Sequence, residues 1–366
     1  MSKVYAVDLF AGGGGLSLGL KQAGFDVIAA VELDSVACET YRINHKETII
    51  LEKDIKLIRG TELLKISPSG EIDLIAACPP CQGFSSLTHK NKKYDPRNEL
   101  INEFVRIVEE CLPKTIMMEN VPGLVNKGKL LFENAIDSFR RIGYSIEFKV
   151  VNVADYGVPQ SRRRLVVLGT RVNQEKLSIP LPTHQKNLND SCDNEKNNLS
   201  KLERWVSTEK SLNLIKVKAE IMNINSKIFN PIDFNWHVTR KLSELNILRL
   251  KSQKAGDSRY QIPLHLRPKC HKLNNGFPNV YARMSLDQPA PTITGGCTTL
   301  SKGRFGHPVE NRTISVREAA LLQTFPLNYV INTKKMDAAC KIIGNALPPL
   351  FAKIMAIKCK EMLKGN

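Results

Sequence analysis

Ile72-Asp73-Leu74-Ile75-Ala76-Ala77 is a short apolar run that stops abruptly at Cys78-Pro79-Pro80-Cys81-Gln82-Gly83-Phe84-Ser85. The run is typical of a buried strand. The two prolines prevent it from continuing as a helix, because proline fixes φ and disfavours helical geometry at the preceding residue. Open α/β sheets place their chemistry at the carboxyl ends of strands. We therefore expect a rigid loop that holds a cysteine thiol at the edge of a sheet.

Strand-like and helix-like stretches alternate on both sides of this run. Alternation of this kind predicts an α/β fold, a mostly parallel sheet with helices on both faces. Besides the strand before Cys78, we expect strands at residues 4–10, 26–33, 115–119, 146–153 and 165–168. We expect helices at residues 16–23, 35–44, 99–111, 129–141, 316–322 and 346–362.

The character of the chain changes after about residue 178. Residues 187–198 are polar and rich in Asn, which is typical of a surface loop. Residues 240–272 contain nine Lys and Arg against two acidic residues and have weak periodicity. We predict a first domain over residues 1–178, a smaller irregular domain over 179–325 and a segment, 326–366, that returns to the first domain.

Composition limits the partners and the compartment. The net charge of +17 (53 Lys and Arg minus 36 Asp and Glu) indicates either a polyanionic partner such as nucleic acid or a simple gain in solubility. The nine cysteines are odd in number and irregularly spaced, which favours reduced thiols over a disulfide framework. No apolar run approaches the roughly 20 residues that cross a bilayer, and the N-terminus does not read as a secretory signal. We expect a cytoplasmic protein without membrane contact.

A glycine-rich loop joins the first expected strand to its helix: Asp8-Leu9-Phe10-Ala11-Gly12-Gly13-Gly14-Gly15. Glycines let the backbone approach a ligand closely, and Glu32, 18 residues after Gly14, stands where an acidic residue takes ribose hydroxyls. The dinucleotide fingerprint Gly-x-Gly-x-x-Gly is not met, because Ser17 occupies the last position. The loop predicts a nucleoside-containing cofactor; a dinucleotide site and a purely structural turn remain the alternatives.

Cys78 and Cys81 have the spacing of a redox dithiol or of half a zinc site. A structural zinc site needs a second cysteine pair or histidines at suitable spacing, and the sequence offers none. A thioredoxin-type motif opens a helix, whereas the residues after Cys81 are typical of a loop. We therefore interpret Cys81 as a nucleophile and expect no metal.

Two further motifs end or begin expected strands. Glu119 closes the strand at 115–119, so it shares an edge of the sheet with Cys81 and can act in proton transfer, although an exposed strand-end Glu is common. Arg162 and Arg164 precede the strand at 165–168, and alternation places both on one face, suited to a carbonyl, phosphate or carboxylate. A solvated charge run is the alternative.

Taken in order, these pieces resemble the DNA (cytosine-5) methyltransferases of the bacterial restriction–modification type. The matching motifs are 8–15, Glu32, Asp54, 80–82, 119–121, Gln160-x-Arg162-x-Arg164, 283–294, 317–326 and 344–349. Ile342 departs from the pattern, since the family often has Gln there. The resemblance implies a Rossmann-like S-adenosylmethionine-dependent methyltransferase sheet with a smaller target-recognition domain, which is the variable part at about 180–275.

The resemblance also implies a mechanism. The Cys81 thiolate adds to C6 of cytosine, which makes C5 nucleophilic toward the methyl group of S-adenosylmethionine. Glu119 contacts N3 and the exocyclic amine, Arg164 holds O2, and Arg162 supports the loop that carries Cys81. A base removes the C5 proton, the thiol is eliminated, and S-adenosylhomocysteine is the second product. The cytosine must be flipped out of the duplex to be reached.

The resemblance also implies cofactor and DNA contacts for further residues of this chain. The cofactor set is Phe10, Ala11, Gly12, Gly14, Gly15, Glu32, Leu33, Asp54, Ile55, Pro80, Leu100, Asn345 and Ala346. The DNA set is Gln82, Ser85 and Thr292, with the basic segment 240–272 reading bases in the major groove. The implied partners are double-stranded DNA and a cognate restriction endonuclease, and we expect a monomer. An RNA cytosine methyltransferase and a catalytically inert DNA-binding protein of this fold are the alternatives.

Overall fold

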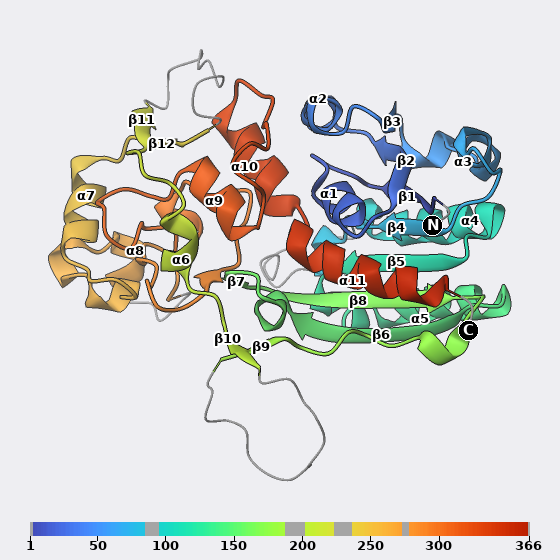
Figure 1. The fold of residues 1–366 in the computed structure, drawn as a ribbon. Helices are drawn as coiled ribbons and strands as arrows, with labels where there is room; N and C mark the ends of the chain where they lie inside the picture. The colour runs from blue at the N-terminus through green and yellow to red at the C-terminus, as the bar shows by residue number, and fades with distance from the viewer. Residues whose placement is uncertain (1–2, 85–94, 187–201, 223–235, 273–277, 365–366) are drawn as a thin grey trace, which may run out of the picture. The chain divides into compact units, whose positions relative to one another are not determined.

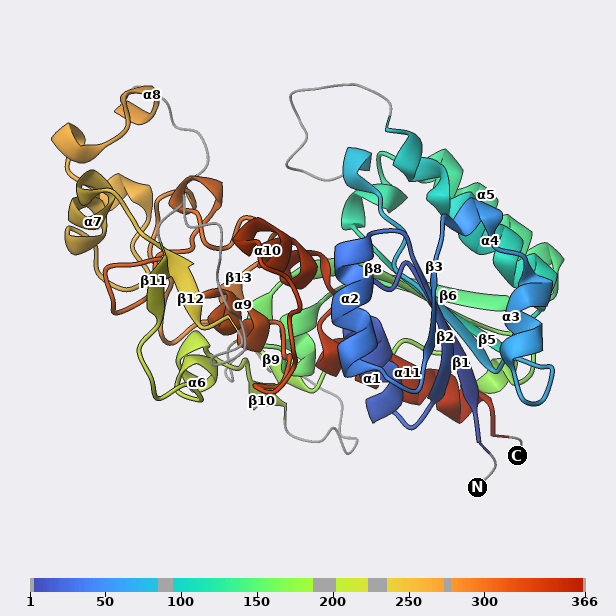
Figure 2. The same cartoon turned by 90° about the horizontal axis from the view of Figure 1, so that it is seen from above.

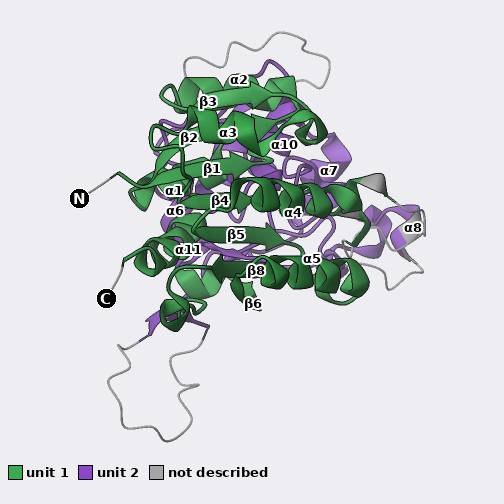
Figure 3. Cartoon of the chain, turned by 90° about the vertical axis from the view of Figure 1, so that its right-hand side faces the viewer, with its two compact units in different colours: residues 1–156, 163–182, 347–366 green, residues 157–162, 183–346 purple. Residues whose placement is uncertain are grey.

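The structure is a computed structural model that describes residues 3–84, 95–186, 202–222, 236–272 and 278–364 (Figure 1). These residues form two compact units. Unit 1 contains residues 1–156, 163–182 and 347–366, and unit 2 contains residues 157–162 and 183–346 (Figure 3). The assignment of catalysis and target recognition to separate parts of the chain stays a prediction.

Unit 1 is built on a seven-stranded sheet with the order β3-β2-β1-β4-β5-β8-β6. The strands are β1 (Tyr5–Leu9), β2 (Asp26–Glu32), β3 (Ile49–Glu52), β4 (Leu74–Ala77), β5 (Thr115–Asn120), β6 (Ser145–Asn152) and β8 (Arg163–Thr170). All neighbours are parallel except β8, which is antiparallel to both β5 and β6. The segment between β6 and β8 is too short for a crossover with its own helix, so the chain turns back instead. The predicted mostly parallel α/β sheet is confirmed.

Helices cover both faces of this sheet (Figure 2). One layer consists of α3 (Gly60–Ile66), α4 (Leu100–Cys111) and α5 (Lys129–Arg141), whose apolar sides join the main core with one face of the strands. The other layer consists of α1 (Gly15–Gln22), α2 (Ser35–Asn44) and α11 (Pro349–Met362). Gly19 of α1 is required here, because a Cβ at this position would collide with Ala352 and the Pro349 carbonyl of α11.

Each expected strand and helix has a counterpart in the structure, which also contains elements that were not predicted. The edge strand β3 and the short helix α3 were not predicted, since β3 is only four residues with exposed ends and α3 begins with a glycine. The helix expected at 346–362 is α11, and the helix before it, α10 (Met336–Asn345), was not predicted. The stretch formed by residues 336–362 is long and apolar enough to cross a membrane. Most of it is buried within the protein, as in the core helix of a protein without a membrane span.

Unit 2 consists of short, irregular elements. Its strand pairs are β7 (Gln160–Ser161) with β13 (Ala290–Pro291), β9 (His184–Gln185) with β10 (Glu203–Arg204), and β11 (Glu220–Met222) with β12 (Val238–Arg240). Its helices are α6 (Thr208–Leu212), α7 (Glu244–Lys251), α8 (Lys269–Lys272), α9 (Val316–Leu322) and α10. Trp236 is fully buried in it, and its indole donates to the Ile331 carbonyl at 2.9 Å. The predicted small irregular part thus has its own core.

Candidate active site

Four polar side chains, Asp8, Cys78, Glu119 and Arg164, lie on one face of the sheet at the carboxyl ends of β1, β4 and β5. We call them the polar row. Ala77 pairs with Met118 in the parallel register of β4 and β5, so Cys78 and Glu119 follow as neighbours on the same face. Asp8 pairs with Ala76, two residues before Cys78, and Glu119 pairs with Val166, two residues from Arg164. Four adjacent strands therefore contribute one group each.

Glu119 and Arg164 form a nearly buried ion pair at the centre of this edge. The Arg164 Nε lies 2.5 Å from the Glu119 Oε1, and the two side chains are 13% and 11% exposed. Burial lowers the pKa of the Arg164 guanidinium, and the neighbouring Glu119 charge opposes that shift. Because buried charges need a partner, the pair fixes the Glu119 carboxylate at the sheet edge.

Cys81 lies in the loop after β4 and is 5% exposed. The side-chain amide of Asn120 donates to the Cys81 sulfur and to the Pro79 carbonyl, both at 3.2 Å. Burial raises the pKa of the Cys81 thiol to about 11, although the bond from Asn120 acts in the opposite direction. The thiol is therefore protonated at neutral pH in the protein alone, and only the thiolate is a strong nucleophile.

The glycine loop has an unusual backbone. Gly12 and Gly14 have φ angles of 54° and 92°, and Phe10 reaches 61°, in the left-handed region that favours glycine. The Glu32 carboxylate holds the loop: it accepts from the Gly12 N–H at 2.7 Å and from the Leu33 and Asp34 N–H groups at 2.8 Å. A Cβ built on Gly12 would meet no described atom within 4 Å, so the loop faces open space.

Asp8 lies buried below this loop. Its Oδ2 accepts from the Ser17 hydroxyl at 2.6 Å, and Ser17 in turn contacts the Tyr41 hydroxyl at 2.7 Å. Its Oδ1 has no hydrogen-bond partner among the described residues. Burial raises the pKa of Asp8 to about 7. An orphaned carboxylate oxygen beside an open glycine loop suits a cofactor that carries positive charge.

The remaining predicted cofactor residues of unit 1 surround the same strand ends. Asp54 caps the short helix η1 (Ile55–Leu57), its Oδ1 accepting from the Lys56 N–H at 3.0 Å, and Ile55 is buried. Leu33 follows Glu32 directly and is 66% exposed. Ala11 is buried, Gly15 begins α1, and Pro80 and Leu100 are partly exposed.

Other predicted residues belong to unit 2. Asn345 ends α10 and Ala346 is its C-cap; just before them, a Cβ on Gly344 would collide with the backbone of Thr294 and Gly295. The hydroxyl of Thr292 donates to the Ser161 carbonyl at 3.0 Å. Of the predicted DNA contacts, Ser85 and the side chain of Gln82 lie outside the described residues.

The prediction that Arg162 and Arg164 share a face of one strand was wrong. The strand is interrupted at Arg162, because β7 ends at Ser161 and β8 begins at Arg163. The Arg162 Nη1 donates to the carbonyls of Ile293 and Gly344 at 2.8 and 3.2 Å within unit 2, whereas Arg164 pairs with Glu119 in unit 1. Support of the Cys81 loop by Arg162 stays a prediction.

The basic segment 240–272 divides into two kinds of cation. Its four arginines turn inward: Arg249 donates to the Leu266 carbonyl at 2.6 Å, Arg267 to the Ile262 carbonyl at 2.7 Å, Arg240 to the Thr298 hydroxyl at 3.0 Å, and Arg259 is buried. The exposed lysines are Lys241, Lys251, Lys254 and Lys269. Among the described side chains of this segment, the fully exposed cations are therefore lysines.

Sequence reasoning gave no role to three residues that the structure places in the site. Asp8 and Cys78 complete the polar row, and Asn120 contacts the sulfur of Cys81. All three lie next to residues that were assigned, and the parallel register of neighbouring strands is the signal that could have found them. In the described part of the chain no cluster of three or more metal-binding side chains occurs, and the seven cysteines with described side chains are free thiols.

Comparison with known proteins agrees with this geometry. The model of the C-5 cytosine-specific DNA methylase family matches residues 4–361. The Type II methylase M.HgiDII of Herpetosiphon aurantiacus is 33% identical over 98% of this chain and 96% of its own, and the Type II methyltransferase M1.HphI of Haemophilus parahaemolyticus is 35% identical over 100% and 88%. An Escherichia coli prophage-encoded DNA modification methyltransferase has a structure with a TM-score of 0.71, at 25% identity and 99% coverage of both chains. The chain therefore belongs to the C-5 cytosine-specific DNA methylase family and is a DNA (cytosine-5) methyltransferase of the Type II restriction–modification kind.

Proposed function

We propose that this protein methylates C5 of a cytosine within a specific double-stranded DNA sequence and uses S-adenosylmethionine as the donor. The observation that carries the proposal is the joint position of Cys81 and the Glu119–Arg164 pair at the sheet edge that also bears the open glycine loop. A nucleophile, a carboxylate and a cation converge there, as addition to a pyrimidine requires.

The residues of the loop fit the proposed donor. When bound, S-adenosylmethionine would supply an activated methyl group on a sulfonium. Phe10, Gly12 and Gly14 would leave room for it, and Glu32, already held by three backbone N–H groups, would present its carboxylate to the ribose. Ile55 and the exposed Leu33 would cover the adenine. Asp8, whose Oδ1 has no partner among the described residues, would supply in its ionised form the negative charge that a sulfonium favours.

Cys81 is proposed to add to C6 of the cytosine. Its sulfur accepts a hydrogen bond from Asn120, which stabilises a thiolate once it forms. The raised pKa keeps the thiol protonated in the absence of DNA, so we propose that the nucleophile becomes active only with substrate in place. Elimination of the thiol after loss of the C5 proton would complete the cycle.

Glu119 and Arg164 are proposed to hold the pyrimidine. Glu119 would bind the exocyclic amine and hold a proton at N3 as electrons move toward the ring, and Arg164 would bind O2. Their ion pair fixes both groups in advance of binding, which reduces the cost of reorganisation during reaction. Neither group reaches a base inside a duplex, so the cytosine must be flipped out.

The proposed biological role is protection of host DNA alongside a cognate endonuclease. It rests on the Type II names of the relatives and on the charge of +17, which favours binding to DNA phosphates. We propose that the protein acts in the cytoplasm as a monomer and that unit 2 supplies the base-reading contacts.

Bisulfite sequencing tests the reaction. A host strain without other cytosine methylases is transformed with the gene, and its DNA is sequenced after bisulfite treatment. We expect protected cytosines at one recurring sequence and none in the vector control. Complete conversion of all cytosines, with soluble protein present, would refute the proposed activity.

A trapping experiment tests the covalent step. Once the recognition sequence is known, a duplex with 5-fluorocytosine at the target position is incubated with protein and S-adenosylmethionine, because fluorine cannot leave as a proton does. We expect an adduct that survives denaturing electrophoresis for the wild type and none for Cys81→Ser. An active wild type that forms no adduct would exclude addition to C6.

A further inference from the structure

Cys78 occupies the middle of the polar row although the mechanism proposed above does not use it. Its N–H donates to the Leu9 carbonyl at 3.3 Å, which fixes its backbone beside β1. The register of β4 and β5 makes it the neighbour of Glu119 on the same face. Asp8 lies on the other side of it, so the thiol is set between two carboxylates.

The Cys78 thiol is a hydrogen-bond donor in this position. The strand register sets its side chain beside the Glu119 carboxylate, and burial together with the charges of Glu119 and Asp8 raises its pKa well above the ordinary value. The sulfur therefore keeps its proton at neutral pH. A protonated thiol beside an ionised carboxylate donates, and the carboxylate accepts.

The Glu119 carboxylate is thus held from two directions. Arg164 reaches it through Nε at 2.5 Å, while the Nη1 of the same guanidinium donates to the Arg163 carbonyl at 2.7 Å. A carboxylate has about four lone-pair sites, so the thiol and the guanidinium leave others free for a substrate. Without the thiol, the carboxylate could rotate toward a second guanidinium nitrogen, because two-pronged pairing with Arg is favourable.

We propose that Cys78 is a positioning residue for methyl transfer, whose thiol proton orients the Glu119 carboxylate toward the target pyrimidine. The inference rests on the proposed role of Glu119 and deepens it. The effect is expected in the chemical step, because Cys78 acts through Glu119 and touches neither DNA nor cofactor in this scheme. Serine at this position, a hydrogen-bond donor of similar size, should preserve the rate of methyl transfer, whereas alanine should not.

The test compares Cys78→Ala and Cys78→Ser with the wild type, using unmethylated bacteriophage DNA and tritiated S-adenosylmethionine. A weak donor to a charged acceptor is worth about a tenfold rate change. We expect kcat to fall about tenfold in Cys78→Ala with KM for DNA and cofactor unchanged, and to return to within about twofold to threefold of wild type in Cys78→Ser. Cys111→Ala is the matched control, because its thiol is also buried and hydrogen-bonded, to the Gly60 carbonyl at 3.5 Å, on the opposite helical layer.

Wild-type kcat in Cys78→Ala would overturn the inference. Equal losses in the alanine and serine variants would overturn it too, since the side chain would then act by packing rather than by donation. Cofactor binding by calorimetry shows whether a variant with low activity still folds; loss of binding in both variants counts as the packing result. If the wild type itself transfers no methyl group to DNA, the proposed function fails, and that outcome is separate from either result on Cys78.

Discussion

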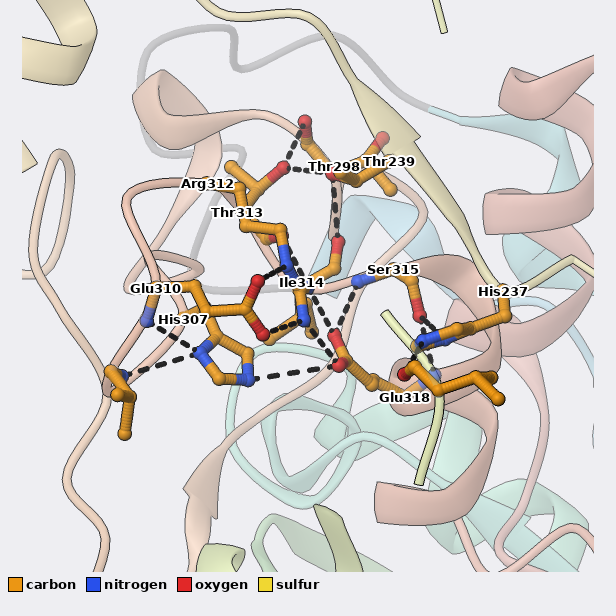
Figure 4. A network of polar contacts seen from close by, with 12 residues as sticks. His237, Thr239, Thr298, His307, Glu310, Arg312, Thr313, Ile314, Ser315 and Glu318 are labelled. Carbon is orange, nitrogen blue, oxygen red and sulfur yellow. Dashed lines mark hydrogen bonds and ion pairs between the residues drawn. The ribbon is translucent and has the colours of Figure 1, made fainter. Parts of the chain in front are cut away.

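Two buried ionic clusters among the described residues, one in each unit, have their hydrogen bonds satisfied to different degrees. In unit 2, Arg312 donates to both oxygens of Glu318 at 2.7 Å and to Glu310 at 2.9 and 3.0 Å (Figure 4). Glu318 also accepts from the Ser315 N–H at 2.7 Å, and His307 accepts from two backbone N–H groups. In the polar row of unit 1, by contrast, Asp8 has an oxygen without a described partner, and Glu119 is held by one guanidinium nitrogen and a thiol.

The physical consequences of the two arrangements differ accordingly. Burial raises the pKa of Asp8 to about 7. Burial also acts to raise the pKa of Glu318, but its interactions with Arg312, His307 and the Ser315 N–H together outweigh desolvation and lower it. The charged groups around Arg312 pair with one another, and Ser315 with Glu318 also forms the N-terminal capping box of α9, as expected of a structural cluster. Partly satisfied groups at a sheet edge have capacity left for a ligand. The two clusters, both buried and charged, therefore differ in how fully their hydrogen bonds are satisfied, and the less satisfied one is the proposed functional cluster.

The sharpest test of this contrast is Glu119→Gln. The change keeps an acceptor for Arg164 but removes the negative charge and the ability to exchange a proton. We expect the rate of methyl transfer to fall by about 10²–10⁴-fold, the range for loss of an acid–base group. Transfer of tritiated methyl groups to DNA measures it, and calorimetry should show retained cofactor binding. Activity within tenfold of wild type would remove Glu119 from the chemical step.

The opposite pattern is expected for Glu318→Ala. Removal of this carboxylate leaves Arg312 in the core of unit 2 with the Thr313 carbonyl and with Glu310, a carboxylate whose side chain is 44% exposed. Breaking a buried ion pair costs about 3–5 kcal/mol of unfolding free energy. Urea unfolding measures the loss, and the activity per folded molecule should stay close to wild type. Glu310→Ala is the matched control at the same arginine, with a loss of about 1 kcal/mol or less; equal losses for both variants would contradict the distinction.

The variant Asp8→Asn tests whether the stability contribution of Asp8 depends on pH. The folded-state pKa of Asp8 is raised from 3.8 to about 7, so the folded protein binds more protons than the unfolded chain between these values. Its contribution to stability therefore falls as pH rises from about 4 to 7 and is constant above that. We expect the asparagine variant to gain stability relative to wild type over this window, by a few kcal/mol in order of magnitude. Unfolding at pH 5 and pH 8 measures it; a difference independent of pH would show that Asp8 is ionised throughout.

The smallest effect is expected for an exposed pair. Lys53 and Glu62 are 3.0 Å apart with side chains 49% and 34% exposed. Because water screens such charges, Lys53→Ala should change the unfolding free energy by less than about 1 kcal/mol. This variant gives the change in unfolding free energy that is expected when an exposed ion pair is lost, against which the changes at buried groups are compared. A loss comparable to that of Glu318→Ala would mean that burial is not what makes the Arg312 cluster important.

Local pattern was sufficient for most of unit 1. The helices at 35–44 and 129–141 were predicted with the observed bounds, because their apolar faces and flanking residues are encoded within a dozen residues. The edge strand β3 was missed because an edge position leaves its pattern half exposed. The break between β7 and β8 falls at Arg162, whose side chain binds the distant backbone carbonyls of Ile293 and Gly344, and it was not visible in the pattern.

The sequence by itself determined the α/β class, the family and the identity of Cys81, Glu119 and the glycine loop as candidates, because ordered motifs and strand ends are local features of the chain. Only the tertiary structure decided which groups meet. Strand register placed Cys78 beside Glu119. Packing turned the four arginines of 240–272 inward while the lysines with described side chains stayed exposed, and burial left one oxygen of Asp8 without a partner among the described residues. Register, packing and desolvation join residues far apart in the chain, and no spacing along a sequence records them.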